Sequence, residues 1–88
     1  MTDDARVKGL AELLEQDLMG KYGPLISNDD LRQALGFASN DAFRQALARK
    51  TMPIPVFPLP NRRGKYALVK DVATWLSRQR EAAAAQMK

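Results

Sequence analysis

Residues 26–49 read ISNDDLRQALGFASNDAFRQALAR, and this stretch predicts two helices joined by a tight turn. Ser27 followed three residues later by Asp30 is a capping pattern, so we expect a short capped helix over residues 26–35. Gly36 supplies the left-handed residue that turns the chain sharply after it. A helix of about two turns is not stable alone, so packing against the rest of the chain must hold it.

The helix that follows, over residues 39–50, has Ser39 as its cap and separates into two faces. Its apolar arc comprises Ala42, Phe43, Ala46 and Leu47. Its opposite arc comprises Asn40, Asp41, Arg44, Gln45, Ala48 and Arg49. Arginine can bridge the two acceptors of guanine, and Asn or Gln can pair with adenine, so this arc fits the major groove of DNA. Asp41 would repel phosphate, and we expect it either to orient Arg44 or Gln45 or to accept from a cytosine amino group.

The run from Met52 to Pro60 cannot be helical, because its four prolines lack amide donors. We expect an extended apolar strand that packs on the core and pairs with residues 66–69 through the turn Asn61-Arg62-Arg63-Gly64. The tip would project Arg62, Arg63 and Lys65 towards phosphates or a narrow minor groove. An isolated Arg-Arg pair is more often a solvated loop, but its place after a helix pair favours a wing that contacts DNA.

A first helix is predicted over residues 5–19, and Gly20, Gly23 and Pro24 are expected to end it. Its apolar stripe comprises Val7, Leu10, Ala11, Leu14 and Leu18. This stripe could cover the core of its own chain, pair with a second copy in a homodimer, or bind a different protein.

A last helix is predicted from Asp71, as its cap, to about Met87. We expect its core-facing side to carry Val72, Ala73, Trp75, Leu76 and Gln79. Ala82 to Ala85 bury little, so this end should fray or contact a neighbour. The predicted fold is therefore mainly α with a small β-hairpin.

The composition excludes several classes of chemistry. The 88 residues contain no cysteine and no histidine, so a thiolate metal site, zinc catalysis and a histidine general base are excluded. Acidic pairs on the helices lack a predicted apolar pocket, so we expect no enzyme, metal or cofactor. The acidic start is unlike a secretory signal, and no apolar run approaches membrane length, so we expect a cytoplasmic protein associated with the nucleoid.

Charge is distributed unevenly along the chain. Residues 1–20 carry a net charge of −3, residues 21–60 carry +2 and residues 61–88 carry +5. A basic half beside an acidic half suits a nucleic-acid surface with a separate element turned away from it. We divide the chain into an N-terminal amphipathic helix at 1–23, a DNA-binding domain at 24–81 and a helical tail at 82–88.

Residues 25–80 resemble the winged helix-turn-helix proteins of the MerR-like superfamily, and within it the small AlpA-type regulators and phage or plasmid excisionases. The pyocin-activator type of regulator is a second likeness. The resemblance is carried by Ile26 to Leu31, Leu35-Gly36-Phe37, the Ser39-capped helix, Met52 to Val56 and the closing Asp71-Val72-Ala73-Thr74-Trp75-Leu76. The chain departs from small family members in its extra N-terminal helix and in the number of prolines in its wing strand.

The resemblance implies sequence-specific binding to double-stranded DNA, either to regulate transcription or to direct recombination. Base contacts would fall to Asn40, Asp41, Arg44 and Gln45. Backbone or wing contacts would fall to Ser39, Arg49, Arg62, Arg63 and Lys65. The alternative is a protein-interaction module, such as an anti-activator or adaptor, that uses the same fold and its acidic N-terminal helix to grip a partner protein.

Overall fold

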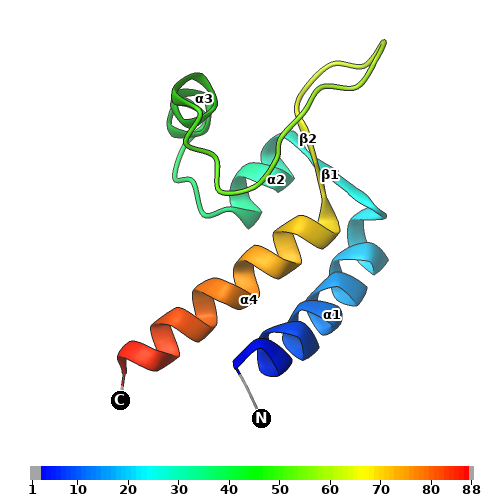
Figure 1. The fold of residues 1–88 in the computed structure, drawn as a ribbon. Helices are drawn as coiled ribbons and strands as arrows, with labels where there is room; N and C mark the ends of the chain where they lie inside the picture. Colours follow the sequence, from blue (N-terminus) through cyan, green and yellow to red (C-terminus); the bar gives the residue numbers. More distant parts are fainter. Residues whose placement is uncertain (1–2, 88) are drawn as a thin grey trace.

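A computed structural model describes residues 3–87 of the protein, with side chains from residue 9 onward. This part of the chain forms four helices and two short strands (Figure 1). In chain order they are α1 (Asp3–Tyr22), β1 (Leu25–Ser27), α2 (Asn28–Ala34), α3 (Asn40–Arg49), β2 (Tyr66–Leu68) and α4 (Val69–Gln86). The mainly helical fold with a small antiparallel element is confirmed.

The two strands pair with each other across a long stretch of chain. β1 and β2 are antiparallel, with Leu25 opposite Leu68, Ile26 opposite Ala67 and Ser27 opposite Tyr66. The predicted pairing of residues 66–69 with the proline-rich run is therefore wrong in its partner. That pairing is reduced to one isolated bridge between Phe57 and Tyr66.

The proline-rich run fails as a strand because of its missing donors. Phe57 retains its amide and donates to the Tyr66 carbonyl at 2.8 Å, and the Tyr66 amide donates back at 2.8 Å. Prolines on either side of this pair cannot extend the ladder. Residues 51–65 therefore form an extended loop, which we call the basic loop, and Ile54 near its start is buried as predicted.

A single core joins these elements. Its buried members are Ile26, Leu31, Leu35, Phe43, Ile54, Ala67, Val69 and Val72. Partly buried side chains pack around them from α1, α3, the basic loop and α4, including Leu18, Leu47, Val56 and Trp75. Trp75 is therefore a packing residue, as its place on the apolar side of the last helix predicts.

The helix predicted over residues 26–35 begins later than expected. Ile26 and Ser27 lie in β1, and α2 starts at Asn28. Ser27 is its N-cap but its side chain makes no capping hydrogen bond, so the predicted capping pattern is wrong. Asn28, the first residue of α2, has a left-handed φ of 52° instead of a helical one. Gly36 has a φ of 83° and turns the chain as predicted.

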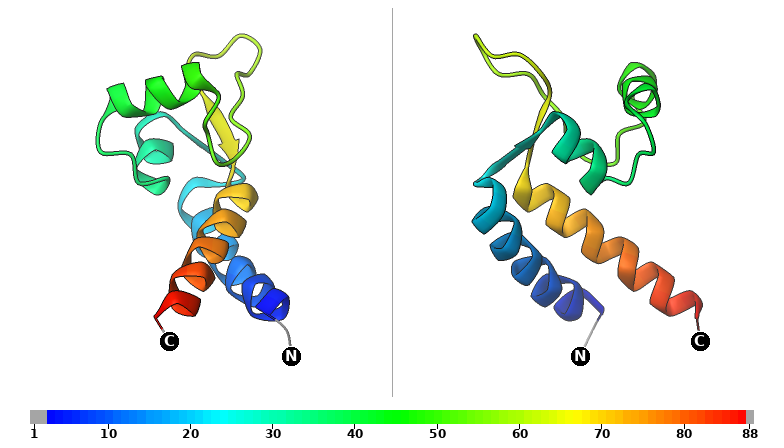
Figure 2. Two further views of the ribbon diagram at one scale, coloured as in Figure 1. Left: turned by 60° about the vertical axis from the view of Figure 1, so that its left-hand side comes forward. Right: turned by 180° about the vertical axis from the view of Figure 1, so that it is seen from behind.

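α1 and α4 run in opposite directions side by side and form the long axis of the molecule (Figure 2). α1 continues to Tyr22, past the expected end at residue 19, because Gly20 alone does not break it. Gly23 does end it, with a φ of 80° and its amide donating to the Met19 carbonyl at 2.9 Å.

The apolar stripe of α1 faces its own chain. Leu10, Ala11, Leu14 and Leu18 are half-buried, and Leu18 packs against the core. The side chain of Val7 lies outside the described residues. Packing of α1 within the same chain is thus the arrangement observed, while Leu13 on the other face is 62% exposed.

α4 begins two residues before its predicted cap. Val69, predicted as strand, is its first residue, and Asp71 lies in its first turn. The helix begins earlier because the Val69 amide donates a hydrogen bond to the Pro24 carbonyl at 2.9 Å. Gln79 is exposed rather than core-facing, and buried Ser77 donates its hydroxyl to the Ala73 carbonyl at 2.8 Å. Ala82 to Ala85 remain helical, since α4 continues to Gln86.

Replacing Leu31 by Ala should lower the unfolding free energy by about 2–5 kcal/mol, because this fully buried side chain would leave a cavity. The control is Leu13→Ala, the same substitution at an exposed site, which should change it by less than about 0.5 kcal/mol. Urea denaturation of both variants measures the difference. Equal losses would contradict the core described here.

Candidate nucleic-acid interface

α3 presents a continuous polar face to solvent. Phe43 and Ala46 are each 7% exposed and fix the opposite face of the helix to the core. The ring of Phe43 meets that of Phe37 edge-on, with centroids 5.7 Å apart. The exposed side chains are Asn40, Asp41, Arg44, Gln45, Ala48 and Arg49, which is the predicted polar arc in full.

The start of α3 is fixed by its cap. The Ser39 side-chain oxygen accepts a hydrogen bond from the Ala42 amide at 3.1 Å, as predicted. At the other end Lys50 adopts a left-handed φ of 57°, and its amide donates to the Leu47 carbonyl. The ten-residue helix is therefore closed at both ends, which holds the polar face in one orientation.

Asp41 forms an ion pair with Arg44 one turn later. The Arg44 Nη2 donates to the Asp41 Oδ1 at 3.0 Å, and both side chains are largely exposed. Such an exposed pair adds at most about 0.5 kcal/mol to stability. Its effect is on orientation, because the carboxylate holds the guanidinium along the helix. Of the predicted partners for Asp41, the structure selects Arg44 rather than Gln45.

The basic loop carries the second cluster of exposed cations. Arg62, Arg63 and Lys65 are all exposed. The turn that holds them uses left-handed residues at Asn61, with a φ of 61°, and Gly64, with a φ of 97°. The Tyr66 hydroxyl donates to the Arg63 carbonyl at 2.9 Å and so links the tip of the loop to β2.

The two clusters lie at the same end of the molecule. In Figures 1 and 2, α3 and the tip of the basic loop both project away from the free ends of α1 and α4. α1 covers neither cluster, since it lies beside α4 at the opposite end (Figure 1). Residues 40–65 contain six Lys or Arg against a single Asp, so this segment is strongly basic. The exposed carboxylate of Asp29 on α2 borders it.

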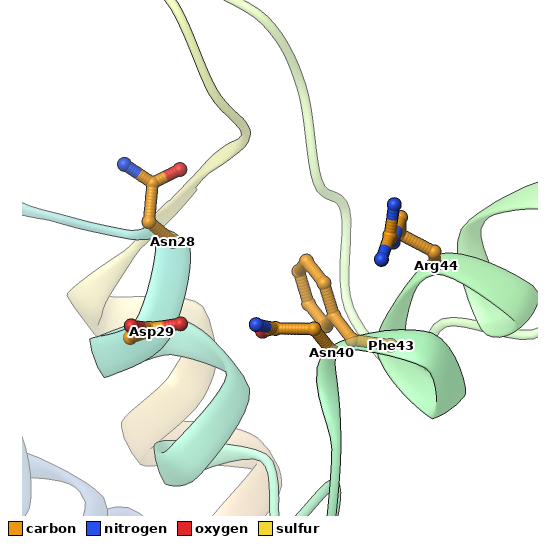
Figure 3. Close-up of a pocket in the computed structure, with 5 residues that line it drawn as sticks. All are labelled: Asn28, Asp29, Asn40, Phe43 and Arg44. Carbon is orange, nitrogen blue, oxygen red and sulfur yellow. The ribbon is translucent and has the colours of Figure 1, made fainter.

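A cleft of about 260 Å³ opens between the first turns of α2 and α3 (Figure 3). Its lining residues are Asn28, Asp29, Asn40, Phe43 and Arg44.

The nearest cation to Asp29 on its own helix is Arg32, whose Nε lies 3.9 Å from the Asp29 Oδ1. Arg32 also donates to the Phe37 carbonyl at 2.8 Å, which ties α2 to the turn before α3.

Two further features are absent from residues 3–87, namely metal-ligand clusters and membrane-spanning helices. No group of three or more His, Cys, Asp or Glu side chains lies close enough there to hold a metal ion. None of the described helices combines the length and apolar character needed to cross a bilayer.

No protein-family profile, curated protein or solved structure matches this chain.

Sequence reasoning found the two exposed clusters but missed Asn28. Asn28 begins α2, lies beside the basic loop and lines the cleft. The sequence around Asn28 gave little indication of this position, because asparagine is tolerated both at a helix start and in a left-handed conformation. The contact with Gly64 joins residues far apart in sequence, and no local pattern encodes it.

The caps of α2 and α3 give a matched comparison. Ser39→Ala should lower the unfolding free energy by about 1 kcal/mol, because it removes the hydrogen bond to the Ala42 amide. Ser27→Ala should cost clearly less, since the Ser27 side chain makes no capping bond. Thermal or urea unfolding of both variants checks this order, and a larger loss for Ser27→Ala would contradict the described caps.

Proposed function

We propose that this protein binds double-stranded DNA sequence-specifically through a winged helix-turn-helix. In this proposal α2 and α3 form the helix pair and the basic loop is the wing. The observation that carries it is the position of α3, with its exposed polar side chains, and of the basic loop at one end of the molecule (Figure 2). A duplex approaching that end would meet both clusters without displacing any element.

The polar face of α3 has the side chains needed to read bases in the major groove. Arg44 offers a guanidinium that can bridge two acceptors of guanine, and Asn40 and Gln45 offer amides that can pair with adenine. The ion pair with Asp41 aims Arg44 before DNA arrives, so less side-chain freedom is lost on binding.

The flanking groups supply affinity rather than sequence discrimination. Arg62, Arg63 and Lys65 on the loop and Arg49 at the end of α3 are exposed cations suited to phosphates. The N-terminal end of α3, at Ser39, would approach the phosphate backbone of the DNA. A protein of this kind acts by binding alone, as a small transcriptional regulator or as an excisionase-type factor that directs recombination.

A second candidate function is protein interaction through the outer face of α1. Leu13 and Met19 on this helix are 62% and 44% exposed, and Glu12 and Asp17 lie exposed beside them. An acidic helix with exposed apolar groups suits a partner protein, including a second copy of this chain. Retention on heparin that salt abolishes supports DNA binding, whereas a salt-insensitive protein complex supports this second function.

Changing Arg62 and Arg63 together to Ala should weaken binding to duplexes of any sequence. If each arginine neutralises a phosphate, the slope of log affinity against log salt should fall in magnitude by about 0.9 per residue. Fluorescence anisotropy at several salt concentrations measures both quantities. The control is the double change Arg78→Ala and Arg80→Ala, which removes the same charge from exposed positions on α4.

The wing is contradicted if the Arg62 and Arg63 variant and wild type bind equally. It is also contradicted if the α4 control loses as much affinity, because net charge alone would then explain the effect.

Arg44→Ala should relax discrimination at one or two base pairs by about 1–3 kcal/mol. Sites selected from a random duplex pool by wild type, followed by titration of single-base variants, provide the measurement. Arg49→Ala on the same helix is the control, since loss of a phosphate contact should lower affinity evenly across those sites. If Arg44→Ala instead lowers the affinity for all these sites equally, Arg44 does not read a base.

A further inference from the structure

The tip of the basic loop is attached to the rest of the protein at few points. The bridge between Phe57 and Tyr66 closes its base. Beyond that bridge the Arg62 amide donates to the Leu59 carbonyl at 3.3 Å, within the loop itself, and the Tyr66 side chain of β2 donates its hydroxyl to the Arg63 carbonyl at 2.9 Å. Among the backbone hydrogen bonds of residues 3–87, the one that ties residues 58–65 to another element is the Asn28 amide donating to the Lys65 carbonyl, at 3.3 Å.

The Asn28 side chain adds a second contact to the same turn. It lies against Gly64 so closely that a Cβ atom on Gly64 would overlap the Asn28 Oδ1 and come within 3.0 Å of the Cγ. Both residues are left-handed, with φ values of 52° and 97°. Glycine at position 64 is favoured by its own left-handed backbone, and a Cβ atom there would force the Asn28 side chain to move away.

Asn28 also lies across a cleft from the other cluster. It lines the cleft between α2 and α3 together with Asn40 and Arg44 (Figure 3). One residue thus touches the turn that carries Arg62 and Arg63 and borders the start of the polar face of α3. No other contact described above joins these two regions.

We infer that Asn28 is a positioning residue that fixes the basic loop relative to α2 and α3. This inference rests on the proposed function for its consequence: the fixed spacing lets Arg44 and the arginines of the loop reach one duplex together. The loop is then ordered before DNA binds, and less conformational entropy is lost on binding.

Asn28→Gly is the sharpest variant. Glycine adopts the left-handed φ freely and keeps the backbone amide that reaches Lys65, so the change removes mainly the side-chain contact with Gly64. Asn28 is exposed, so the fold should survive, as circular dichroism would verify. Gly64→Ala attacks the same contact from the loop side.

The first experiment needs no DNA. Limited trypsin digestion of the full chain cuts after Arg62 and Arg63 at a rate that reports opening of the loop. We expect Asn28→Gly to raise that rate about fivefold, with cutting after Arg78 in α4 unchanged in the same digest. An unchanged rate at the loop, or an equal rise at both places, overturns the inference.

The second experiment is a double-mutant cycle in DNA affinity on one fixed duplex. Asn28→Gly alone should weaken binding about fivefold to tenfold. In the Arg62→Ala, Arg63→Ala background it should weaken binding by less than about twofold, because the arginines that Asn28 positions are gone. An equal loss in both backgrounds overturns the positioning role.

If wild type binds no duplex, the proposed function fails, and the trypsin digest still decides the contact between Asn28 and the loop.

Discussion

The pairing of β1 with β2 is the constraint on which the arrangement depends. Three residues on each side bring together the chain before α2 and the chain after the basic loop. Ile26 and Ala67 meet at the centre of this pairing, and both are buried in the core. α2, α3 and the basic loop all lie between the two paired strands in sequence, and α3 and the loop emerge at the same end of the molecule.

Local patterns predicted what local physics determines. The polar and apolar faces of α3, the Ser39 cap and the contact between Asp41 and Arg44 all involve residues within one or two turns. The sequence therefore carried enough information for them, and the structure agrees. The exposed tip of the loop was predictable for the same reason, because a turn with adjacent arginines and a glycine has little to bury.

Long-range pairing was beyond the same reasoning. β1 has only three residues, which is too short for an alternating pattern, and its Ser27 resembles a helix cap. The proline-rich run is more apolar and closer to β2 in sequence, so it looked like the better partner. Similarly, the stripe of α1 has the same composition whether it packs on α4 or on another chain, and only the folded arrangement distinguishes them.

β2 passes into α4 without a connecting residue, since Leu68 ends the strand and Val69 begins the helix. The Pro24 carbonyl accepts a hydrogen bond from the first amide of α4 and so ties the start of α4 to the chain just after α1. An eighteen-residue helix is about 27 Å long, and a tilt of about 5° at Val69 moves its far tip by about 2 Å. Because β2 also receives the chain from the basic loop, any tilt of α4 about Val69 would be smallest beside the loop and largest at the end of the helix remote from it.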